Sequence, residues 1–209
     1  MLWLNIVITV AVSYVLGNLN GAILISKYLV HDDVRKHGSG NAGMTNFFRS
    51  FGGIKTLLVA LIDMGKAAAA CYLGGLLLRD FGLYEEGLMV GALAVSIGHD
   101  FPAFLKFKGG KGILCGFAVA LVLDWRIALI IFVIFAVFYG ITKYVSLGSV
   151  LGSAGFGLGF VIFHYDNLFI MIGGVILGAL AVYMHRSNIR RLLSKSESKV
   201  YLSKKRRQS

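Results

Sequence analysis

Seven apolar stretches, separated by short polar connections, constrain this sequence more than any other feature. Most approach the roughly 20 residues that a helix needs to cross a hydrocarbon layer about 30 Å thick. Hydrophobic residues make up 57% of the chain, which holds 1 proline. Continuous apolar runs exclude a membrane β-barrel, whose strands alternate polar and apolar residues. We therefore expect an all-α fold, a polytopic membrane helix bundle with seven transmembrane spans.

The expected spans follow one another along residues 2–184. In chain order they are Leu2–Ile25, Thr56–Leu78, Leu88–Phe104, Gly112–Leu123, Ile127–Thr142, Val145–Phe163 and Leu168–Met184. The fourth is short, because about 12 residues rise only about 18 Å as an α-helix. It therefore begins inside the polar segment before it or stops short of the far surface. The pattern predicts one membrane domain over residues 1–193 and a basic tail over residues 194–209.

Basic residues gather on alternate connections, which indicates how the chain is oriented. One side of the expected bundle carries Lys27, Arg35, Lys36, Arg49, Lys55, Lys106, Lys108, Lys111, Lys143, Arg186, Arg190, Arg191, Lys195, Lys199, Lys204, Lys205, Arg206 and Arg207. The opposite connections carry Arg79 and Arg126 together with several acidic residues. Because basic loops remain cytoplasmic, we expect the N-terminus outside and the C-terminus inside.

The net charge of +11 raises the question of nucleic-acid binding. A basic tail such as SKKRRQS is able in principle to bind nucleic acid. In a polytopic chain, however, such a tail more often sets topology and contacts anionic lipid. We therefore expect membrane lipid, and no nucleic acid, among the partners.

Three polar clusters stand out, all on the expected cytoplasmic side. They are GSGNAGMTN with Arg49, within residues 38–49; FKGGKG, residues 107–112; and HRSNIRRLL, residues 185–193. Taken singly, they have simpler interpretations as a flexible turn, a basic anchor and an interfacial helix. The outer connections carry no comparable cluster, so we expect the three to converge at the inner membrane surface.

The residue types in these clusters suit the binding of oxyanions. Gly109 and Gly110 let backbone N–H groups approach an anion closely, and Lys108 and Lys111 flank them with positive charge. Arg49 offers a planar fork for a phosphate dianion. Neutral hydrogen-bonding groups come from Ser39, Asn41, Thr45 and Asn46. The loop is not a Walker A motif, because GxxxxGK[ST] is absent. Together the clusters predict a site for two phosphate-type groups.

Asp63 and Lys66 stand three residues apart in the second span and so share one helical face. Because a charge in lipid is costly, we expect them to pair inside the bundle. Such a pair either supports the cytoplasmic loops or is purely structural. His99 and His185 border the proposed site and remain candidates for a role in it.

Together, the clusters resemble the signatures of a bacterial enzyme family, the integral-membrane glycerol-3-phosphate acyltransferases that take their acyl group from acyl phosphate. The segments that carry the resemblance are GSGNAGMTN with Arg49, GHDFPAFLKFKGGKG and YMHRSNIRRLL. It covers nearly the whole chain, including its length, spans and order of motifs. It implies a multi-pass enzyme of the bacterial plasma membrane with its active site on the cytoplasmic face.

The resemblance also implies roles for individual residues. Catalytic roles fall on Ser39, Arg49 and Lys111. Contacts to glycerol 3-phosphate fall on Ser39, Arg49, Lys111, His185 and Asn188. Contacts to acyl phosphate fall on Gly40, Asn41, Thr45, Asn46, Lys108, Gly109, Gly110 and Gly112. Two departures from the family pattern are Met44, in place of a small alanine, and Ile113–Cys115, in place of Val-Ala-Thr.

The implied reaction transfers an acyl group from acyl phosphate to the sn-1 hydroxyl of glycerol 3-phosphate. Its products are lysophosphatidic acid and phosphate, which makes it the first step of phospholipid synthesis. No His-x-x-x-x-Asp motif occurs, and no Ser-His-Asp or Cys-His arrangement is evident. Because acyl phosphate is already activated, positioning and charge stabilisation can carry the reaction. We hypothesise direct attack, with a substrate phosphate oxygen taking the proton.

No cofactor and no metal are expected. Cys71 and Cys115 lie in apolar segments without the spacing of metal ligands, and they are interpreted as small buried residues.

Two rival functions remain open. A transporter of an organic phosphate would also suit many spans and an anion site, but transporters usually show repeated halves and a site at the bilayer midplane. A noncatalytic scaffold that recruits partners through its basic tail would leave the asparagine- and glycine-rich loop unexplained.

Overall fold

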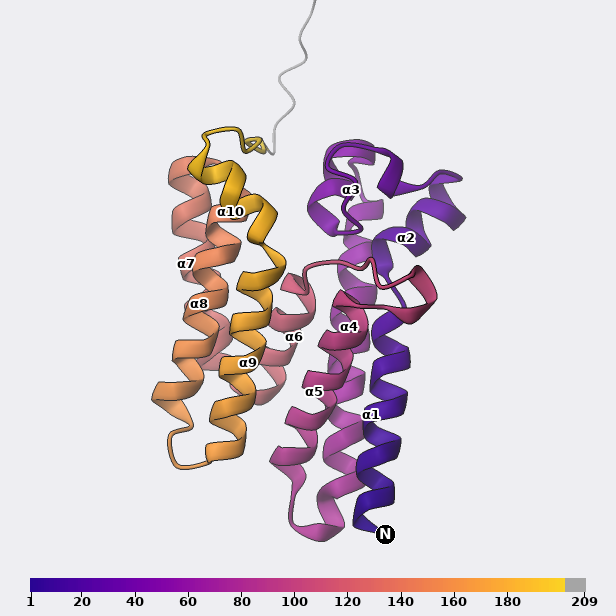
Figure 1. Cartoon of the computed structure of the whole chain (residues 1–209), viewed down its shortest axis with the longest axis vertical. Helices are drawn as coiled ribbons and strands as arrows, with labels where there is room; N and C mark the ends of the chain where they lie inside the picture. Colours follow the sequence, from indigo (N-terminus) through magenta and orange to yellow (C-terminus); the bar gives the residue numbers. More distant parts are fainter. Residues whose placement is uncertain (202–209) are drawn as a thin grey trace, which may run out of the picture.

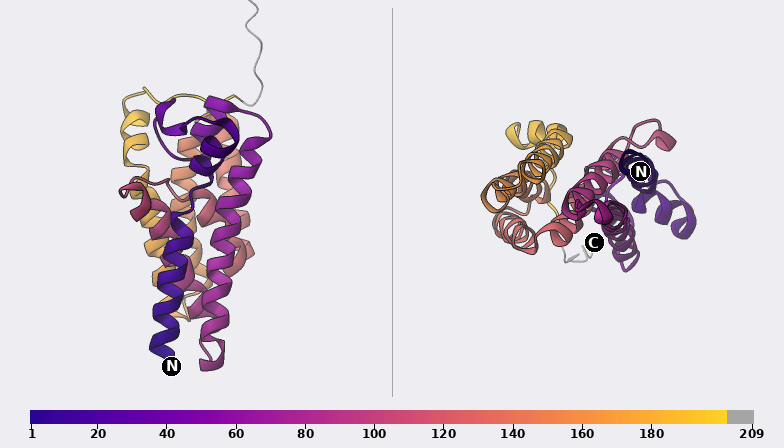
Figure 2. Two further views of the ribbon diagram at one scale, coloured as in Figure 1. Left: turned by 90° about the vertical axis from the view of Figure 1, so that its right-hand side faces the viewer. Right: turned by 90° about the horizontal axis from the view of Figure 1, so that it is seen from below.

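The structure, a computed structural model, describes residues 1–201 and contains two groups of long helices joined by a shorter one (Figure 1). The first group consists of α1 (Leu2–Asn18), α4 (Lys55–Leu78) and α5 (Tyr84–Asp100). The second group consists of α7 (Trp125–Thr142), α8 (Val145–Phe163) and α9 (Leu168–Met184). Between them lies α6 (Ile113–Leu123), which contacts α4 and α7 (Figure 2).

Short elements connect the long helices. They are α2 (Gly21–Ile25), the π-helix η1 (Ser26–Val30), α3 (Met44–Phe51), α10 (Arg186–Leu193) and the 3-10 turns η2 (Val34–Lys36), η3 (Arg79–Phe81) and η4 (Ala103–Leu105). Figure 1 shows α2, α3 and α10 gathered at the end of the bundle that lies opposite the N-terminus. The first and third polar clusters are therefore found near the same end.

The chain is an all-helical membrane bundle, as its apolar runs predict. Four helical segments among the described residues are long and apolar enough to cross a membrane alone: Lys55–Phe81, Tyr84–Leu105, Trp125–Thr142 and Val145–Phe163. The number rises to 6 if each of two bent pairs counts as one span. These pairs are Leu2–Asn18 with Gly21–Val30, bent by 42°, and Leu168–Met184 with Arg186–Leu193, bent by 54°. The 11 residues of α6 rise only about 17 Å, so this helix is short, as expected.

Glycines allow the helices of the first group to approach closely. A Cβ atom at Gly87 would collide with the Gly74 carbonyl of α4, and one at Gly98 would collide with the Tyr14 carbonyl of α1. Lipid offers no hydrophobic drive for helix association, so such contacts between backbones supply van der Waals attraction instead. The frequent small residues of the spans thus explain how α1, α4 and α5 form a rigid support.

The first apolar run, expected as Leu2–Ile25, is interrupted after Asn18. The Asn20 side chain accepts a hydrogen bond from Ile23 N at 3.0 Å and so caps the helix α2. Its amide donates to the Ala42 carbonyl at 2.9 Å. The interruption therefore ties α1 to the loop that carries the first polar cluster.

The third run, expected as Leu88–Phe104, lies within the helical segment Tyr84–Leu105, which begins four residues earlier and whose regular α-helix, α5, spans Tyr84–Asp100. Glu85 and Glu86 lie in its first turn, where negative charge complements the helix dipole. The helix ends before Phe101 because a residue that precedes proline is driven out of the helical region. Phe101 has φ −127° and ψ 61°.

Residues 194–201, expected as the start of a basic tail, lie against the bundle. Glu197 and Val200 are both buried. Val200 N donates to the Lys143 carbonyl at 2.9 Å, and the Tyr139 hydroxyl donates to the Val200 carbonyl at 3.3 Å. The rest of the expected tail, residues 202–209, lies outside the described residues.

Candidate active site

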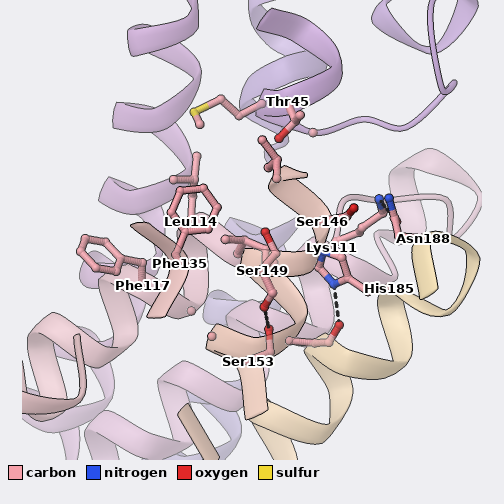
Figure 3. Close-up of a pocket in the computed structure, with 18 of the residues that line it drawn as sticks. Thr45, Lys111, Leu114, Phe117, Phe135, Ser146, Ser149, Ser153, His185 and Asn188 are labelled. Atoms are coloured by element: carbon pink, nitrogen blue, oxygen red, sulfur yellow. Dashed lines mark hydrogen bonds between the residues drawn. The ribbon is translucent and has the colours of Figure 1, made fainter. Parts of the chain in front are cut away.

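A cavity of about 390 Å³ is lined by residues from both helix groups and from α6. Its polar end is formed by residues of all three clusters: Ser39, Asn41, Thr45, Asn46, Arg49, Lys111, Gly112, His185 and Asn188. The predicted convergence of the clusters is therefore confirmed. Figure 3 shows Lys111, Asn188 and His185 close together at this end, with Ser146 of α8 beside them.

The first cluster is held in shape by one buried side chain, that of Asn46. Its Oδ1 accepts a hydrogen bond from Ser39 N at 3.0 Å. Its Nδ2 lies 3.0 Å from the carbonyls of Val34 and His37 and 3.1 Å from that of Asn41. Asn46 thus uses its hydrogen-bonding capacity within the loop, and it fixes the backbone from which Ser39 and Asn41 reach the cavity.

The second cluster folds against the end of α5. Gly110 N donates to the His99 carbonyl at 3.1 Å. A Cβ atom at Gly109 would collide with that carbonyl, and one at Gly110 would collide with the His99 imidazole. Only glycine fits at both positions, so the loop sequence follows from its close approach to His99.

The third cluster meets the second through Lys111, whose Nζ donates to Asn188 Oδ1 at 2.5 Å. Asn188 Nδ2 in turn donates to Glu197 Oε1 at 2.9 Å, and Arg191 Nε donates to Glu197 Oε2 at 2.6 Å. The Glu197 carboxylate thereby orients Asn188, and through it Lys111. Nearby, His185 caps the end of α9, with its Nδ1 placed 2.8 Å from the Ala181 carbonyl.

Arg49 approaches the same end from α3. Its Nη2 donates to the Ser198 carbonyl at 2.9 Å. Its Nε is buried and has no hydrogen-bond partner among residues 1–201. Because buried donors are normally paired, this atom remains available to a ligand in the cavity.

Positive charge prevails at the polar end. Lys111, Arg49 and Arg191 lie near the Glu197 carboxylate, and two further carboxylates, those of Asp63 and Asp100, also line the cavity. Burial, together with repulsion from Arg191 and Arg49, lowers the pKa of Lys111 to about 8. Burial likewise lowers the pKa of Arg49. Cations that are crowded and poorly hydrated in this way are stabilised when an anion arrives.

The other residues that were assigned to acyl-phosphate contacts lie outside this cavity. Lys108, Gly109 and Gly110 line an adjoining cavity of about 310 Å³, which shares Asn41, Asp100 and Lys111 with the first. Arg186 and Arg190 also line this second cavity. Gly40 is exposed and lines neither of the two.

The other end of the main cavity is apolar and lies among α6, α7, α8 and α9. Its lining includes Leu114, Phe117, Phe132, Phe135, Phe156 and Leu177. Small residues of α8 also line it, including Ser149, Gly152 and Ser153. Figure 3 shows the rings of Phe117 and Phe135 and the side chain of Leu114 on the same side of this space. A hydrocarbon chain is the ligand that such a wall accepts.

A buried cluster of charged and polar side chains lies beneath the polar end. The predicted pair of Asp63 and Lys66 is confirmed, with 2.9 Å between Oδ1 and Nζ. Lys66 Nζ also lies 2.8 Å from His99 Nδ1. Ligand atoms of Asp63, His99 and Cys115 come within 4.8 Å of one another. The lysine ammonium already bonds to two of these three residues, so the cluster contains its own cation and does not fit a metal ion.

Sequence reasoning did not find the roles of Glu197 and Arg191. Glu197 is the one acidic residue in a tail whose charged residues are otherwise basic, and this contrast could have indicated that it has a specific partner. Its partners are close in the chain: Asn188 lies nine residues earlier and Arg191 lies six. What could not be foreseen is that the chain after α10 turns back over the cavity.

The fold and the cavity together define a class of protein. A membrane bundle holds one cavity with a cationic, hydrogen-bonding end and an apolar end. Such a site suits molecules that join a phosphate group to a hydrocarbon chain.

Comparison with known proteins supports and narrows this class. A protein-family model described as glycerol-3-phosphate acyltransferase matches residues 7–195. The glycerol-3-phosphate acyltransferase of Thermoanaerobacter sp. (strain X514) is 40% identical over 93% of this chain and 95% of its own. That of Finegoldia magna is 39% identical over 96% of this chain and 98% of its own.

Two crystal structures of PlsY (YgiH), an integral membrane glycerol 3-phosphate acyltransferase, share the fold. The glycerol 3-phosphate form gives a TM-score of 0.83 at 30% identity, covering 94% of this chain and 96% of that one. The lysophosphatidic acid form gives a TM-score of 0.80 at 28% identity, and the match covers 94% of this chain and 95% of that one. This chain therefore belongs to the glycerol-3-phosphate acyltransferase family, and it is an enzyme integral to the membrane.

Proposed function

We propose that this acyltransferase takes its acyl group from acyl phosphate and transfers it to the sn-1 hydroxyl of glycerol 3-phosphate. The products are lysophosphatidic acid and phosphate. The observation that carries the proposal is the continuity of one cavity from a cationic end to an apolar end. The acyl chain lies in the apolar part, and the two phosphate groups lie where Arg49, Lys111 and the glycine loop supply donors and positive charge.

We propose that the glycerol hydroxyl attacks the acyl carbon directly, without an acyl-enzyme. Among the described residues, neither imidazole that lines the cavity bonds to a serine hydroxyl or a cysteine thiol: His185 Nδ1 lies against the Ala181 carbonyl and His99 Nδ1 against Lys66. Neither is arranged as the base of a serine or cysteine nucleophile. As the C–O bond forms, the bond from the acyl carbon to the phosphate oxygen breaks, and a substrate phosphate oxygen takes the hydroxyl proton.

In this mechanism the protein contributes position and charge. Lys111 and Arg49 neutralise the phosphates and stabilise the negative charge that develops on the departing phosphate. Ser39, His185 and Asn188 orient glycerol 3-phosphate so that its hydroxyl faces the acyl carbon, and Asn41 contacts the acyl phosphate. The polar end is placed at the cytoplasmic face, with the N-terminus outside and seven spans, of which α6 is the short one. The positive-inside rule supports this orientation.

The test is an assay of the purified protein with glycerol 3-phosphate and either palmitoyl phosphate or palmitoyl-CoA. We expect lysophosphatidic acid and phosphate from the first donor and no product from the second. The activity should collapse in Arg49→Ala and Lys111→Ala. Transfer from palmitoyl-CoA alone would contradict the proposed donor.

Direct attack is tested separately. Rapid quenching during turnover, followed by mass spectrometry of the intact protein, should find no covalent acyl group. An acyl-protein that forms and decays at the rate of turnover would replace direct attack by a two-step mechanism.

A further inference from the structure

His99 lies between two parts of the molecule that must be aligned. On one side its Nδ1 lies 2.8 Å from Lys66 Nζ. On the other side its ring packs against Gly110, where a Cβ atom added to the glycine would meet Nε2 first. His99 is buried, and it also lines the main cavity. Its two ring nitrogens therefore face different environments.

The surroundings of Lys66 settle which nitrogen of His99 carries the proton. Nζ lies within hydrogen-bond distance of Asp63 Oδ1 and of the Gly17 and Leu19 carbonyls. These oxygen atoms can only accept, and the ion pair with Asp63 makes Lys66 an ammonium, which can only donate. Nδ1 of His99 must then accept from Lys66. In a neutral imidazole the proton consequently resides on Nε2.

Lys66 also joins the two loops that build the polar end. The carbonyls of Gly17 and Leu19 stand at the break between α1 and α2, next to Asn20, which binds the first cluster through the Ala42 carbonyl. Asp63 Oδ1 accepts from Gly21 N at 3.1 Å on the other side of the same break. His99, in turn, holds the glycine loop through its carbonyl and its ring. One ammonium thus links both halves of the phosphate-binding end.

We infer that His99 is a further substrate-binding residue of this enzyme, which presents an Nε2–H donor to a substrate phosphate, and that Asp63 and Lys66 are the positioning residues that fix this tautomer. The inference rests on the proposed placement of the phosphates at the polar end. A neutral donor adds a directed hydrogen bond there without adding repulsion to Lys111 and Arg49.

The tautomer can be observed directly by 15N NMR of the full-length protein labelled with [15N]histidine in detergent. The resonances of His99 and His185 are assigned by comparing the wild type with His99→Asn and His185→Asn. We expect His99 to show a protonated Nε2 and an unprotonated Nδ1. In the double variant Asp63→Asn, Lys66→Met, which removes both charges together, the two tautomers should become mixed. A protonated Nδ1 in the wild type would overturn the inference.

Titration of the labelled protein identifies the phosphate concerned. Glycerol 3-phosphate and a non-reactive palmitoyl phosphonate are added in separate experiments. The ligand that shifts the His99 Nε2–H resonance is the one whose phosphate group binds His99. Movement of His185 without movement of His99 in either arm would refute the role of His99 and leave the proposed site intact. Movement of neither histidine would refute the proposed site and the inference with it.

Two substitutions separate the functions of the ring nitrogens. The amide oxygen of His99→Asn replaces Nδ1 as acceptor for Lys66 but leaves no donor at the Nε2 position, whereas His99→Gln can place an N–H there. Loss of a hydrogen bond to a charged group should raise KM for the bound substrate about tenfold in His99→Asn. His99→Gln should recover part of this loss, although it lacks the acceptor for Lys66. Equal KM values in His99→Asn and the wild type, at unchanged thermal stability, would overturn the inference.

Discussion

The polar end and the apolar end of the cavity are built by different means. At the polar end, residues from segments far apart in the chain are fixed by specific hydrogen bonds, such as those from Lys111 to Asn188 and from Asn188 to Glu197. At the apolar end, the walls are faces of α6, α7, α8 and α9, shaped by side-chain size alone. If the proposed function holds, we expect the enzyme to tolerate variation in its hydrocarbon ligand but little variation in the geometry of its phosphates. Substitutions at the two ends should therefore affect different kinetic constants.

The largest effect is expected from Lys111→Met, which removes the central cation of the polar end. Loss of a preorganised group that stabilises transition-state charge costs roughly 100- to 1000-fold in kcat. Lys106→Met, in the same connection but exposed and outside both cavities, is the matched control and should retain activity. Steady-state kinetics with both substrates measure the effect. Comparable losses in both variants would mean that the charge of the loop, rather than this site, is what matters.

A smaller loss is expected from Glu197→Gln. This change keeps the size of the side chain but weakens the hydrogen bonds to Asn188 and Arg191, so that Lys111 loses its fixed partner. From the usual strength of hydrogen bonds to charged groups, we expect kcat/KM for glycerol 3-phosphate to fall about thirtyfold. The control is Glu85→Gln, on an exposed turn at the start of α5. Wild-type kinetics in Glu197→Gln would show that the segment after α10 does not organise the site.

The pH dependence of kcat/KM for glycerol 3-phosphate should report the protonation of Lys111 in the free enzyme. Burial lowers its pKa to about 8, and a lysine is cationic only below its pKa. Anion binding should therefore weaken as pH rises through about 8, with kcat/KM for glycerol 3-phosphate falling about tenfold between pH 7 and pH 9. In Lys111→Arg the fall should move to higher pH, because arginine stays charged. An unchanged profile in that variant would assign the titration to another group.

The smallest effect is expected at the apolar end, where bulk can be added without strain. A Cβ atom at Gly116 meets nothing within 4 Å, and this residue lines the cavity. Gly116→Leu should shift the preferred acyl phosphate to shorter chains by a few-fold in kcat/KM, while KM for glycerol 3-phosphate stays the same. Gly140→Leu on α7 is the control, since its Cβ also meets open space, but outside the cavity. A rise in KM for glycerol 3-phosphate in Gly116→Leu would show that the two ends are not separate.

The sequence predicted the helices and the convergence of the polar clusters because both depend on patterns that are local in the chain. Apolar runs predicted the class of fold, and basic connections indicated which loops share a side. The third span begins earlier than predicted, at Tyr84, because the two glutamates of its first turn were given less weight than hydropathy, and Pro102 ends the regular α-helix at Asp100 within that span. The interruption at Asn20 was missed because its cap faces a loop more than 20 residues away.

The site was less predictable where it depends on tertiary contacts. The spacing of Asp63 and Lys66 predicted their pair, but nothing in the sequence placed His99 against Lys66 or Gly110. The resemblance assigned Asn46 to the acyl phosphate, and the structure adds that its amide holds the loop, which no local pattern indicated. Glu197 was overlooked because the tail was interpreted only through its basic residues, as a segment that sets topology and contacts anionic lipid.

Everything proposed for the site depends on one cavity that holds the phosphate of the lipid at its polar end and the acyl chain among α6–α9. The most direct test is photolabelling of the purified enzyme with a lysophosphatidic acid that carries a diazirine at the end of its acyl chain, followed by peptide mapping. We expect labels on the cavity-facing residues of α6, α7 and α8, lost in Lys111→Met and retained in Lys106→Met. Labels on the outer faces of α1 and α4, or labels that do not respond to Lys111→Met, would contradict a single cavity with this division of roles.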